Sequence, residues 1–443
     1  MAGWLACRVV SRRKGSETRA RSLRFVLAAA AVALAASVGG TRSAAAVLPP
    51  GNAAQQWNKI AEDTAVGAGA FQGEAFLYLA YVSAAMDRAV NPGERNGQSA
   101  DAAVAQAAHD VLVHYFPAKA SDLDALLDTS LAAVPDGAAK RNGIRHGERA
   151  ADKILRERTD DGLQTPIAST SPFPTLPFGP GVWRLTPSAY AKPQTPWMAN
   201  MRPFVLRRAD QFLPPPPPSL HSQAWVDAFN EVKSLGAVNS GARTTEQTTI
   251  ATFWSANVNR QWGMLTRNLA TSLGLDVPES ARFFAMVDVT LADAGIAFMN
   301  AKYHYLFWRP VTAIDPTSVT NDGFGTVPGV DDGNPMTVEQ PGWRPLLATP
   351  NHPEYPSAHA TFTSAIAEVL THFLGTSNIN VDVQGQPDFS MTRHFNTADQ
   401  LRTEVGNARV WAGLHYRFSV NAGAELGREV ADYDLERAFS RGG

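Results

Sequence analysis

Three clusters of basic and hydrogen-bonding residues in the last third of the chain have the types and spacing to hold one small anion. In the first cluster, Lys302 and Arg309 lie two helical turns apart, so on one helix both would point from nearly the same face. Pro310 would end that helix directly after Arg309. Because the surroundings are aromatic and burying unpaired cations is costly, we expect an anionic partner. The alternative is two surface charges whose stems lie along apolar residues.

The second cluster is the run NHPEYPSAH that ends at His359. Pro356 fits the first position of a helix. The first-turn amides of Ser357, Ala358 and His359 would then have no partner within the helix and would form an anion seat at its positive end. Ser357 adds a hydroxyl donor, and His359 can give or take a proton. The alternative is an ordinary helix start with an incidental histidine.

The third cluster is RVWAGLH, from Arg409 to His415. Arg409 offers a planar fork that fits a tetrahedral oxyanion. His415 can act as a ligand or a nucleophile through one ring nitrogen. Six residues do not span one helical face, but arginine is long and Gly413 can end the helix. Each cluster alone has an ordinary packing explanation, whereas all three together indicate one oxyanion site.

The elements that must position these clusters are predicted to be helices. Apolar residues recur at helical spacing in four stretches, Val104–Tyr115, Phe284–Phe298, Phe362–Phe373 and Leu401–Ala412. The runs Thr244–Gln247 and Thr397–Gln400 predict capping boxes. Strand-like alternation is scarce, so the fold class is predicted to be all-α.

Two segments interrupt this pattern. Between Pro166 and Pro218 lie 14 of the 30 prolines, so the segment 166–218 cannot be a regular helix. It either links two helical halves or lies along the surface in extended form. The Gly-, Asp- and Asn-rich run from Asp315 to Pro341 is predicted to be a solvated loop.

Residues 1–46 are predicted to be a secretory signal peptide. Seven basic residues precede the apolar run Phe25–Val38, and small residues up to Ala46 offer a cleavage site before Val47. The apolar run is short for a membrane span, although an uncleaved anchor is the alternative. The pair Arg12-Arg13 leaves a twin-arginine export route open. We therefore expect residues 47–443 to be one helical domain, secreted or periplasmic and without a membrane span.

The charge and cysteine content exclude several classes of function. The whole chain has a net charge of −2, and the first 46 residues hold eight Lys/Arg and one Glu, which leaves 31 basic and 40 acidic residues after them. This balance argues against nucleic acid or an anionic membrane as a partner. The single cysteine, Cys7, lies in the predicted signal peptide, so a disulfide scaffold, a thiolate metal site and a cysteine nucleophile are excluded.

The order Lys-x6-Arg-Pro, Pro-Ser-x-His and Arg-x5-His resembles the signature of the vanadium-dependent haloperoxidases and the type 2 phosphatidic acid phosphatase (PAP2-like) acid phosphatases. The resemblance is good over about 280–430. It implies an all-helical bundle of the haloperoxidase and acid phosphatase type, soluble and secreted, with vanadate or phosphate bound at one end.

The resemblance also implies roles for individual residues. The equatorial oxygens of the oxyanion would be bound by Lys302, Arg309, Ser357, the amide of Ala358, and Arg409. His415 would be the vanadium ligand, or the nucleophile of a phosphatase, and His359 the acid–base residue. Lys302 would also polarise bound peroxide.

Three positions depart from the family pattern or refine it. Ala358 stands where the signature has Gly, which is tolerable if its backbone is helical. Ser419 stands where phosphatase members usually have Asp, and a neutral residue there weakens a phosphohistidine mechanism. His352 falls where chlorinating members tend to have Phe and algal brominating members have His, so the resemblance favours bromide. The alternative is that His352 only caps a loop.

The reading that follows is a vanadate-dependent haloperoxidase that oxidises halide, with bromide favoured, using hydrogen peroxide to give hypohalous acid. The alternative is a secreted acid phosphatase that hydrolyses phosphate monoesters through a phosphohistidine. A third possibility, from a different class, is a binding protein that holds the anion without turnover. The sequence does not predict the oligomeric state.

Overall fold

The computed structural model describes residues 46–90, 97–166, 179–319, 331–387 and 390–440. All the elements below belong to the unit that ends at residue 443 and begins at residue 45. Residues 1–45 of the predicted signal peptide lie outside the described residues. So do residues 167–178 of the proline-rich segment and residues 320–330 of the predicted solvated loop.

The described part of the chain is mostly helical, which confirms the predicted fold class. The first half holds α1 (Ala53–Gly67), α2 (Gln72–Ala89), α3 (Ala100–Tyr115), α4 (Ala120–Ala132), α5 (Ala138–Glu157) and α6 (Gln223–Leu235). The second half holds α7 (Thr245–Phe253), α8 (Val258–Ser272), α9 (Val277–Tyr305), α10 (Pro310–Ile314), α11 (Ala358–Leu374), α12 (Ala398–Trp411) and α13 (Arg417–Ala438). The strands β1 (Val381–Gln384) and β2 (Thr392–Phe395) form an antiparallel hairpin, the one sheet in the described residues.

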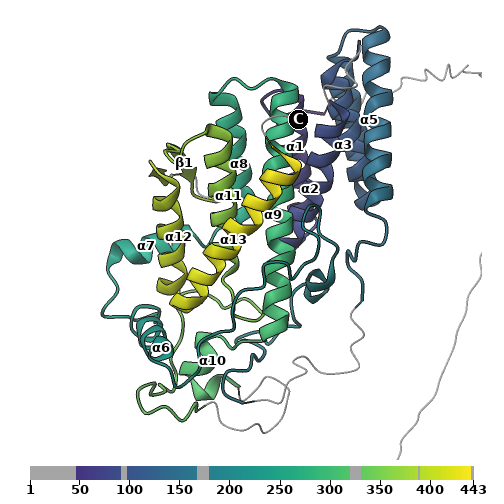
Figure 1. Cartoon of the computed structure of the whole chain (residues 1–443). Helices are drawn as coiled ribbons and strands as arrows, with labels where there is room; N and C mark the ends of the chain where they lie inside the picture. The colour runs from purple at the N-terminus through teal and green to yellow at the C-terminus, as the bar shows by residue number, and fades with distance from the viewer. Residues whose placement is uncertain (1–45, 91–96, 167–178, 320–330, 388–389, 441–443) are drawn as a thin grey trace, which may run out of the picture. The chain divides into compact units, whose positions relative to one another are not determined.

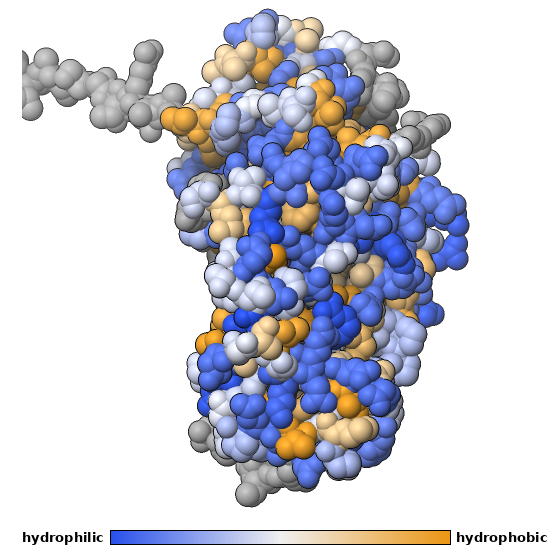
Figure 2. All heavy atoms as spheres, turned by 90° about the vertical axis from the view of Figure 1, so that its left-hand side faces the viewer, coloured by the Kyte–Doolittle hydropathy of each residue, from blue (hydrophilic) through white to orange (hydrophobic). Residues whose placement is uncertain are grey.

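The 29-residue helix α9 is the centre of the bundle. In Figure 1 it runs between α1, α2 and α3 on one side and α11 and α13 on the other, and it packs against α2, α11 and α13. By length and composition alone it could cross a membrane, but 94% of its most apolar window is buried among other helices. The N-terminal and C-terminal helices therefore share one core around α9. Figure 2 shows a face of the molecule on which hydrophilic side chains predominate and hydrophobic ones are scattered.

Helix starts follow the polar signals in the sequence. At Thr244 and Thr397 both halves of the predicted capping box are present. The threonine side chain accepts from the backbone amide of the glutamine three residues later, and that glutamine side chain accepts from the backbone amide of the threonine. The same arrangement begins α1 at Asn52 and α9 at Asp276. These side chains satisfy amides that each helix start would otherwise leave unpaired.

The prediction that one helix carries both Lys302 and Arg309 is wrong. Helix α9 ends at Tyr305, Leu306 adopts a left-handed conformation (φ 48°), and Arg309 is the N-cap of α10. A non-glycine residue in this region costs about 1–2 kcal/mol. The buried Leu306 side chain and the hydrogen bond from the Trp183 amide to the Leu306 carbonyl (2.7 Å) hold the chain in this break.

The described part of the proline-rich segment, 179–218, contains a 3-10 turn and no α-helix. It runs against the residues that follow α9. Besides the Trp183 bond, the Trp308 amide donates to the Gly181 carbonyl (3.1 Å). The Tyr355 hydroxyl donates to the Pro215 carbonyl (2.7 Å). The segment thus braces the loops on which the first two predicted clusters lie.

Helices α11 and α13 cross at unusually close range. A Cβ at Gly423 would lie 2.5 Å from the Ser357 carbonyl oxygen, and one at Gly427 would lie 2.2 Å from the Thr361 carbonyl oxygen. Only glycine fits at these two positions without a shift of the backbone. The crossing fixes the start of α11 directly against α13.

Candidate oxyanion site

The N-terminus of α11 forms the floor of the site. Ser357 is the N-cap, so the prediction that Pro356 is the first helical residue is wrong by two positions, and Ala358 is the first. Ala358 lies within the helix and is not among the residues with positive φ, which makes the replacement of Gly tolerable.

The donors at this terminus differ in one respect from the prediction. The Ser357 amide is used, because it donates to the Ser419 carbonyl (3.1 Å). The amides of Ala358, His359 and Ala360 remain at the open end of the helix. The buried Ser357 hydroxyl makes no cap bond and has no partner in the described structure. These groups form the donor-rich seat that the sequence indicated.

Lys302 is buried in the last turn of α9 and points at the loop before α11. Its ammonium donates to the carbonyl oxygens of Pro353 (3.0 Å), Glu354 (2.8 Å) and Pro356 (2.5 Å). These bonds tie the loop to α9. They also place a positive charge beside the helix terminus, since no carboxylate oxygen contacts the ammonium in the described residues.

Arg309 holds two loops and two histidines together. Its guanidinium donates to the carbonyl oxygens of His352 and Leu414, both at 3.0 Å. It also donates to Nδ1 of His352 (3.0 Å) and to Nε2 of His415 (3.2 Å). The fixed fork of arginine can serve all these acceptors at once, which a lysine cannot do.

Arg409 reaches the site from the last turn of α12. One guanidinium nitrogen donates to the Trp254 carbonyl (3.0 Å), while Nε is buried without a partner. Helix α12 ends at Trp411 and Gly413 has φ 76°, so the chain reverses there and brings His415 back to the same site. The spacing of six residues therefore works through a turn rather than a helical face.

Sequence reasoning missed Glu354. This buried carboxylate accepts a hydrogen bond from Nδ1 of His415 (2.8 Å) and another from the Tyr416 amide (3.1 Å). The conclusion that His415 has only the neutral Ser419 to orient it is therefore wrong. The available signal was the one acidic residue in the run from Asn351 to Ser357.

The cavity beside these groups has a volume of about 60 Å³. Its inner wall is formed by Ala358, His359, Arg409 and His415. Its outer wall comes from the start of α2 and from α8, α9 and α11, with Phe71, Gln72, Gly73, Val258, Phe298 and Phe362. His352 also lines it, with its ring 5.9 Å from that of Phe71 in an edge-to-face arrangement. The half-buried His359 has no hydrogen-bond partner among the described residues. The cavity has room for a small oxyanion or a few waters.

Positive charge exceeds negative charge at the site. Lys302, Arg309 and Arg409 are buried there with a single carboxylate, Glu354. Burial and the neighbouring Arg309 hold the pKa of Lys302 well below its ordinary value. Burial, with Arg309 again, lowers the pKa of Arg409 to about 9, and burial lowers that of Arg309 to about 10. Such shifts mean that the charged forms of these three side chains are destabilised until an anion binds beside them.

The three histidines respond to the same field. Burial followed by the nearby cations lowers the pKa of His352, His359 and His415 well below the ordinary value, so the imidazoles are neutral. Burial raises the pKa of Glu354 to about 7, while Arg309 and Lys302 act in the opposite direction. A neutral imidazole is the form that binds a metal centre or attacks phosphorus.

These residues fit a tetrahedral oxyanion such as vanadate or phosphate. The buried Ser357 hydroxyl and the Arg409 Nε lack partners, the first amides of α11 are open, and the positive charge is in excess. The lone pair of His415 Nε2 accepts a hydrogen bond from Arg309 Nη1 (3.2 Å), which a bound oxyanion would replace. All predicted site residues are thus brought together, with Lys302, Arg309 and Ser357 packed behind the residues that line the cavity.

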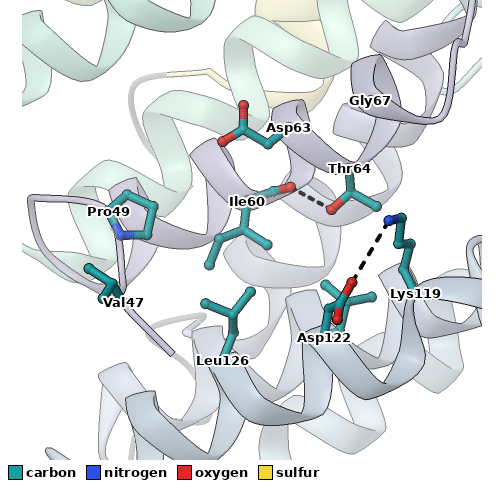
Figure 3. Close-up of a pocket in the computed structure, with 10 residues that line it drawn as sticks. Val47, Pro49, Ile60, Asp63, Thr64, Gly67, Lys119, Asp122 and Leu126 are labelled. Atoms are coloured by element: carbon teal, nitrogen blue, oxygen red, sulfur yellow. Dashed lines mark hydrogen bonds and ion pairs between the residues drawn. The ribbon is translucent and has the colours of Figure 1, made fainter. Parts of the chain in front are cut away.

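A second, larger hollow has different chemistry. The cavity between α1 and α4 has a volume of about 290 Å³ and is lined by apolar residues such as Ile60 and Leu126. Figure 3 shows its one cation, Lys119, paired with Asp122 (3.8 Å). None of the residues of the three sequence clusters lines it.

Known proteins of one family resemble this chain in sequence and in fold. A family model described as the VCPO second helical-bundle domain matches residues 282–441. Vanadium chloroperoxidase from Curvularia inaequalis is 25% identical, over 69% of this chain and 61% of its own length. The chain therefore spans less than two thirds of that relative.

Two solved structures share the fold. A bacterial vanadium-dependent iodoperoxidase superposes with a TM-score of 0.71 at 22% identity, over 88% of this chain and 98% of its own. The holo form of a bacterial vanadium-dependent chloroperoxidase gives 0.64 at 17% identity, over 88% and 98%. The fold is therefore the helical bundle of the vanadium haloperoxidases. In sequence over residues 282–441 and in fold, the chain is similar to the vanadium haloperoxidases.

Proposed function

We propose that the protein is a vanadate-dependent haloperoxidase that oxidises halide with hydrogen peroxide to hypohalous acid. The observation that carries this proposal is the excess of buried positive charge at the open N-terminus of α11, next to a neutral histidine. Vanadate when bound supplies Lewis-acid activation of hydrogen peroxide toward halide. The superfamily relatives named above support this choice of oxyanion.

The residues of the chain divide the work as follows. His415 would hold vanadate through Nε2, since Nδ1 is engaged by Glu354. Arg309, Arg409, the Ser357 hydroxyl and the amide of Ala358 bind its other oxygens and balance their charge. Lys302 adds positive charge where the peroxide oxygens become electron-rich.

His359 moves the proton. It lines the cavity with no partner among the described residues, so one ring nitrogen can exchange a proton with peroxide or with the leaving hydroxide. Burial, together with the cations around it, lowers the pKa of His359 and keeps its imidazole neutral in the absence of an anion. It therefore begins the reaction as a base.

The halide pocket is assigned to the outer side of the cavity, where His352 faces Phe71. A neutral imidazole against an aromatic wall offers a polarisable surface with little charge. The resemblance at position 352 favours bromide over chloride.

Acid phosphatase activity is the second candidate, and Glu354 favours it. A carboxylate on Nδ1 raises the basicity of His415, which a phosphohistidine mechanism requires. His415 Nε2 would attack phosphorus, and His359 would protonate the leaving oxygen. The objection based on Ser419 no longer applies.

The test is a parallel assay of purified residues 47–443 before and after incubation with orthovanadate. Vanadate-dependent bromination of a dimedone-type acceptor with peroxide and bromide supports the haloperoxidase. Hydrolysis of a phosphate ester that is inhibited by vanadate would instead support the acid phosphatase and contradict the haloperoxidase. Binding of vanadate and phosphate without either reaction identifies an oxyanion-binding protein, with no turnover.

Export is also proposed rather than established. Residues 1–46 carry the basic, apolar and small-residue order of a signal peptide. Sequencing the N-terminus of protein recovered from outside the cytoplasm should give Val47 as the first residue. Recovery of Met1 there would contradict cleavage.

A further inference from the structure

Glu354 is held by hydrogen bonds of both its backbone and its side chain. Its amide donates to the Phe307 carbonyl (2.9 Å), and its own carbonyl accepts from Lys302 (2.8 Å). Its carboxylate Oε1 accepts from His415 Nδ1 (2.8 Å) and from the Tyr416 amide (3.1 Å). The side chain is buried, so these bonds lie away from bulk water. Backbone and side chain together fix where Oε1 lies.

This geometry selects one tautomer of His415. A carboxylate oxygen accepts only, so Nδ1 must carry the proton and Nε2 must carry the lone pair. Nε2 in turn lies 3.2 Å from Nη1 of Arg309, which can only donate. Donor and acceptor roles therefore agree on both sides of the ring. The lone pair at Nε2 is the one that a vanadium centre or a phosphorus atom needs.

The surroundings of Glu354 explain why a neutral residue stands at position 419. The backbone carbonyl of Ser419 accepts from the Ser357 amide, which places α13 directly beside the loop that carries Glu354. The hydroxyl of Ser419 and Oε2 of Glu354 are both buried, and neither has a hydrogen-bond partner among the described residues. A carboxylate at 419 would therefore enter the space that Glu354 already fills.

We propose that Glu354 is the positioning residue of His415, holding its ring and tautomer for oxyanion binding, and that its carboxylate can be supplied from position 419 instead. The inference rests on the oxyanion-binding function proposed above. It adds to that function the residue that prepares the histidine, and it assigns this task to the loop before α11 rather than to α13.

The test compares four variants with the wild type, after circular dichroism confirms that each is folded. Glu354→Gln keeps the shape and one acceptor oxygen but removes the charge. Glu354→Asp keeps the charge and withdraws it by one methylene group. The double variant Glu354→Ala/Ser419→Asp empties the space of the Glu354 side chain and moves the charge to α13. Glu368→Gln, which disrupts the pair with Arg402 on the side of α11 away from the site, is the matched control.

Two readouts are used. The first is the affinity of the metal-free protein for orthovanadate, and the second is the protonation of the His415 ring nitrogens by nitrogen-15 NMR. Glu354→Gln should weaken vanadate binding by about 10-fold or more and reduce the fraction of His415 protonated at Nδ1. Glu354→Asp should lie between it and the wild type. The double variant should recover most of both properties, and Glu368→Gln should match the wild type.

The proposal is overturned if Glu354→Gln binds vanadate within twofold of the wild type and the tautomer is unchanged. It is also overturned if the double variant, while folded, recovers neither property. If Glu354→Gln does not fold, Glu354→Asp and the double variant decide the matter by the same readouts. Wild-type protein that binds neither vanadate nor phosphate would refute the proposed function separately, because the NMR comparison needs no ligand.

Discussion

Nη1 of Arg309 lies 3.2 Å from Nε2 of His415, although α10 and α13, the helices nearest to these residues in the chain, belong to different parts of the bundle. The same guanidinium holds the His352 ring and two backbone carbonyls. Arg309 is thus the group through which the first and third sequence clusters meet. Its fork sets how far apart the two histidines stand.

Arg309→Lys should abolish this arrangement while keeping the charge. A lysine ammonium cannot reach four acceptors in different directions, so His415 and His352 would lose their common partner. We expect the affinity for orthovanadate to fall by about 10-fold or more, which corresponds to ~1.4 kcal/mol. The measurement is an equilibrium titration. Arg402→Lys, at an ion pair between α11 and α12, is the matched control and should leave the affinity unchanged. Equal affinities in both variants would refute the assigned role.

Gly423→Ala should damage the site without touching any of its side chains. The added Cβ would lie 2.5 Å from the Ser357 carbonyl oxygen, so α13 must move away from the start of α11. We expect a loss of about 1–3 kcal/mol in the free energy of unfolding and a weaker affinity for vanadate or phosphate. Gly67→Ala, where nothing lies within 4 Å, is the control. Chemical denaturation and oxyanion titration check the two effects, and unchanged affinity in a destabilised protein would show that the seat tolerates the shift.

His109 should make stability depend on pH. Burial disfavours its charged form, but hydrogen bonds from its ring to Asp110 and Asp124 (both 2.8 Å) outweigh this and raise the pKa of His109. Because the folded protein holds this proton more tightly, the stabilisation is fully present below the ordinary histidine pKa and is lost as the pH rises through the raised value. His109→Gln should therefore lower the free energy of unfolding by about 1 kcal/mol near pH 5.5 and by less at pH 9. The effect is small because Asp124 is exposed to solvent. A cost independent of pH would contradict the assignment.

Asp434 should act in the opposite way. Both of its carboxylate oxygens are buried without a partner, and burial, with Asp293 nearby, raises the pKa of Asp434 well above its ordinary value. The folded state must therefore keep a proton that the unfolded state releases, so this residue costs stability increasingly as the pH rises above about 4. The free energy of unfolding of Asp434→Asn, relative to that of the wild type, should rise between pH 5 and 8 by at most ~1.4 kcal/mol per pH unit. Urea denaturation at several pH values measures the difference, and parallel stability curves would refute it.

The sequence predicted the composition of the site better than its geometry. The three clusters were identified because cations, a helix start and histidines have known uses at anion sites, and the fold brings them to one place. The single helix through Lys302 and Arg309 was wrong because nothing in the type of Leu306 signals a left-handed residue, which is set by packing against Trp183. Glu354 was missed because its partner His415 is 61 residues away and comes close only through the fold.

The outer wall of the cavity could not be predicted for the same reason. Phe71, Gln72 and Val258 carry no motif and lie far from the signature along the chain. They reach the site because α2 and α8 pack around the same core as α9. Long-range packing decides such positions, and local spacing does not report it.

Because of the close crossing of α11 and α13 at Gly423 and Gly427, two parts of the site tolerate substitutions differently. The oxyanion seat rests on main-chain atoms that touch across the two helices, so few substitutions there leave it in place. The outer wall rests on the side chains of Phe71 and its neighbours, which can change one at a time. Side chains of the outer wall can therefore be exchanged to change what enters the cavity, while the main-chain contact between α11 and α13 stays in place.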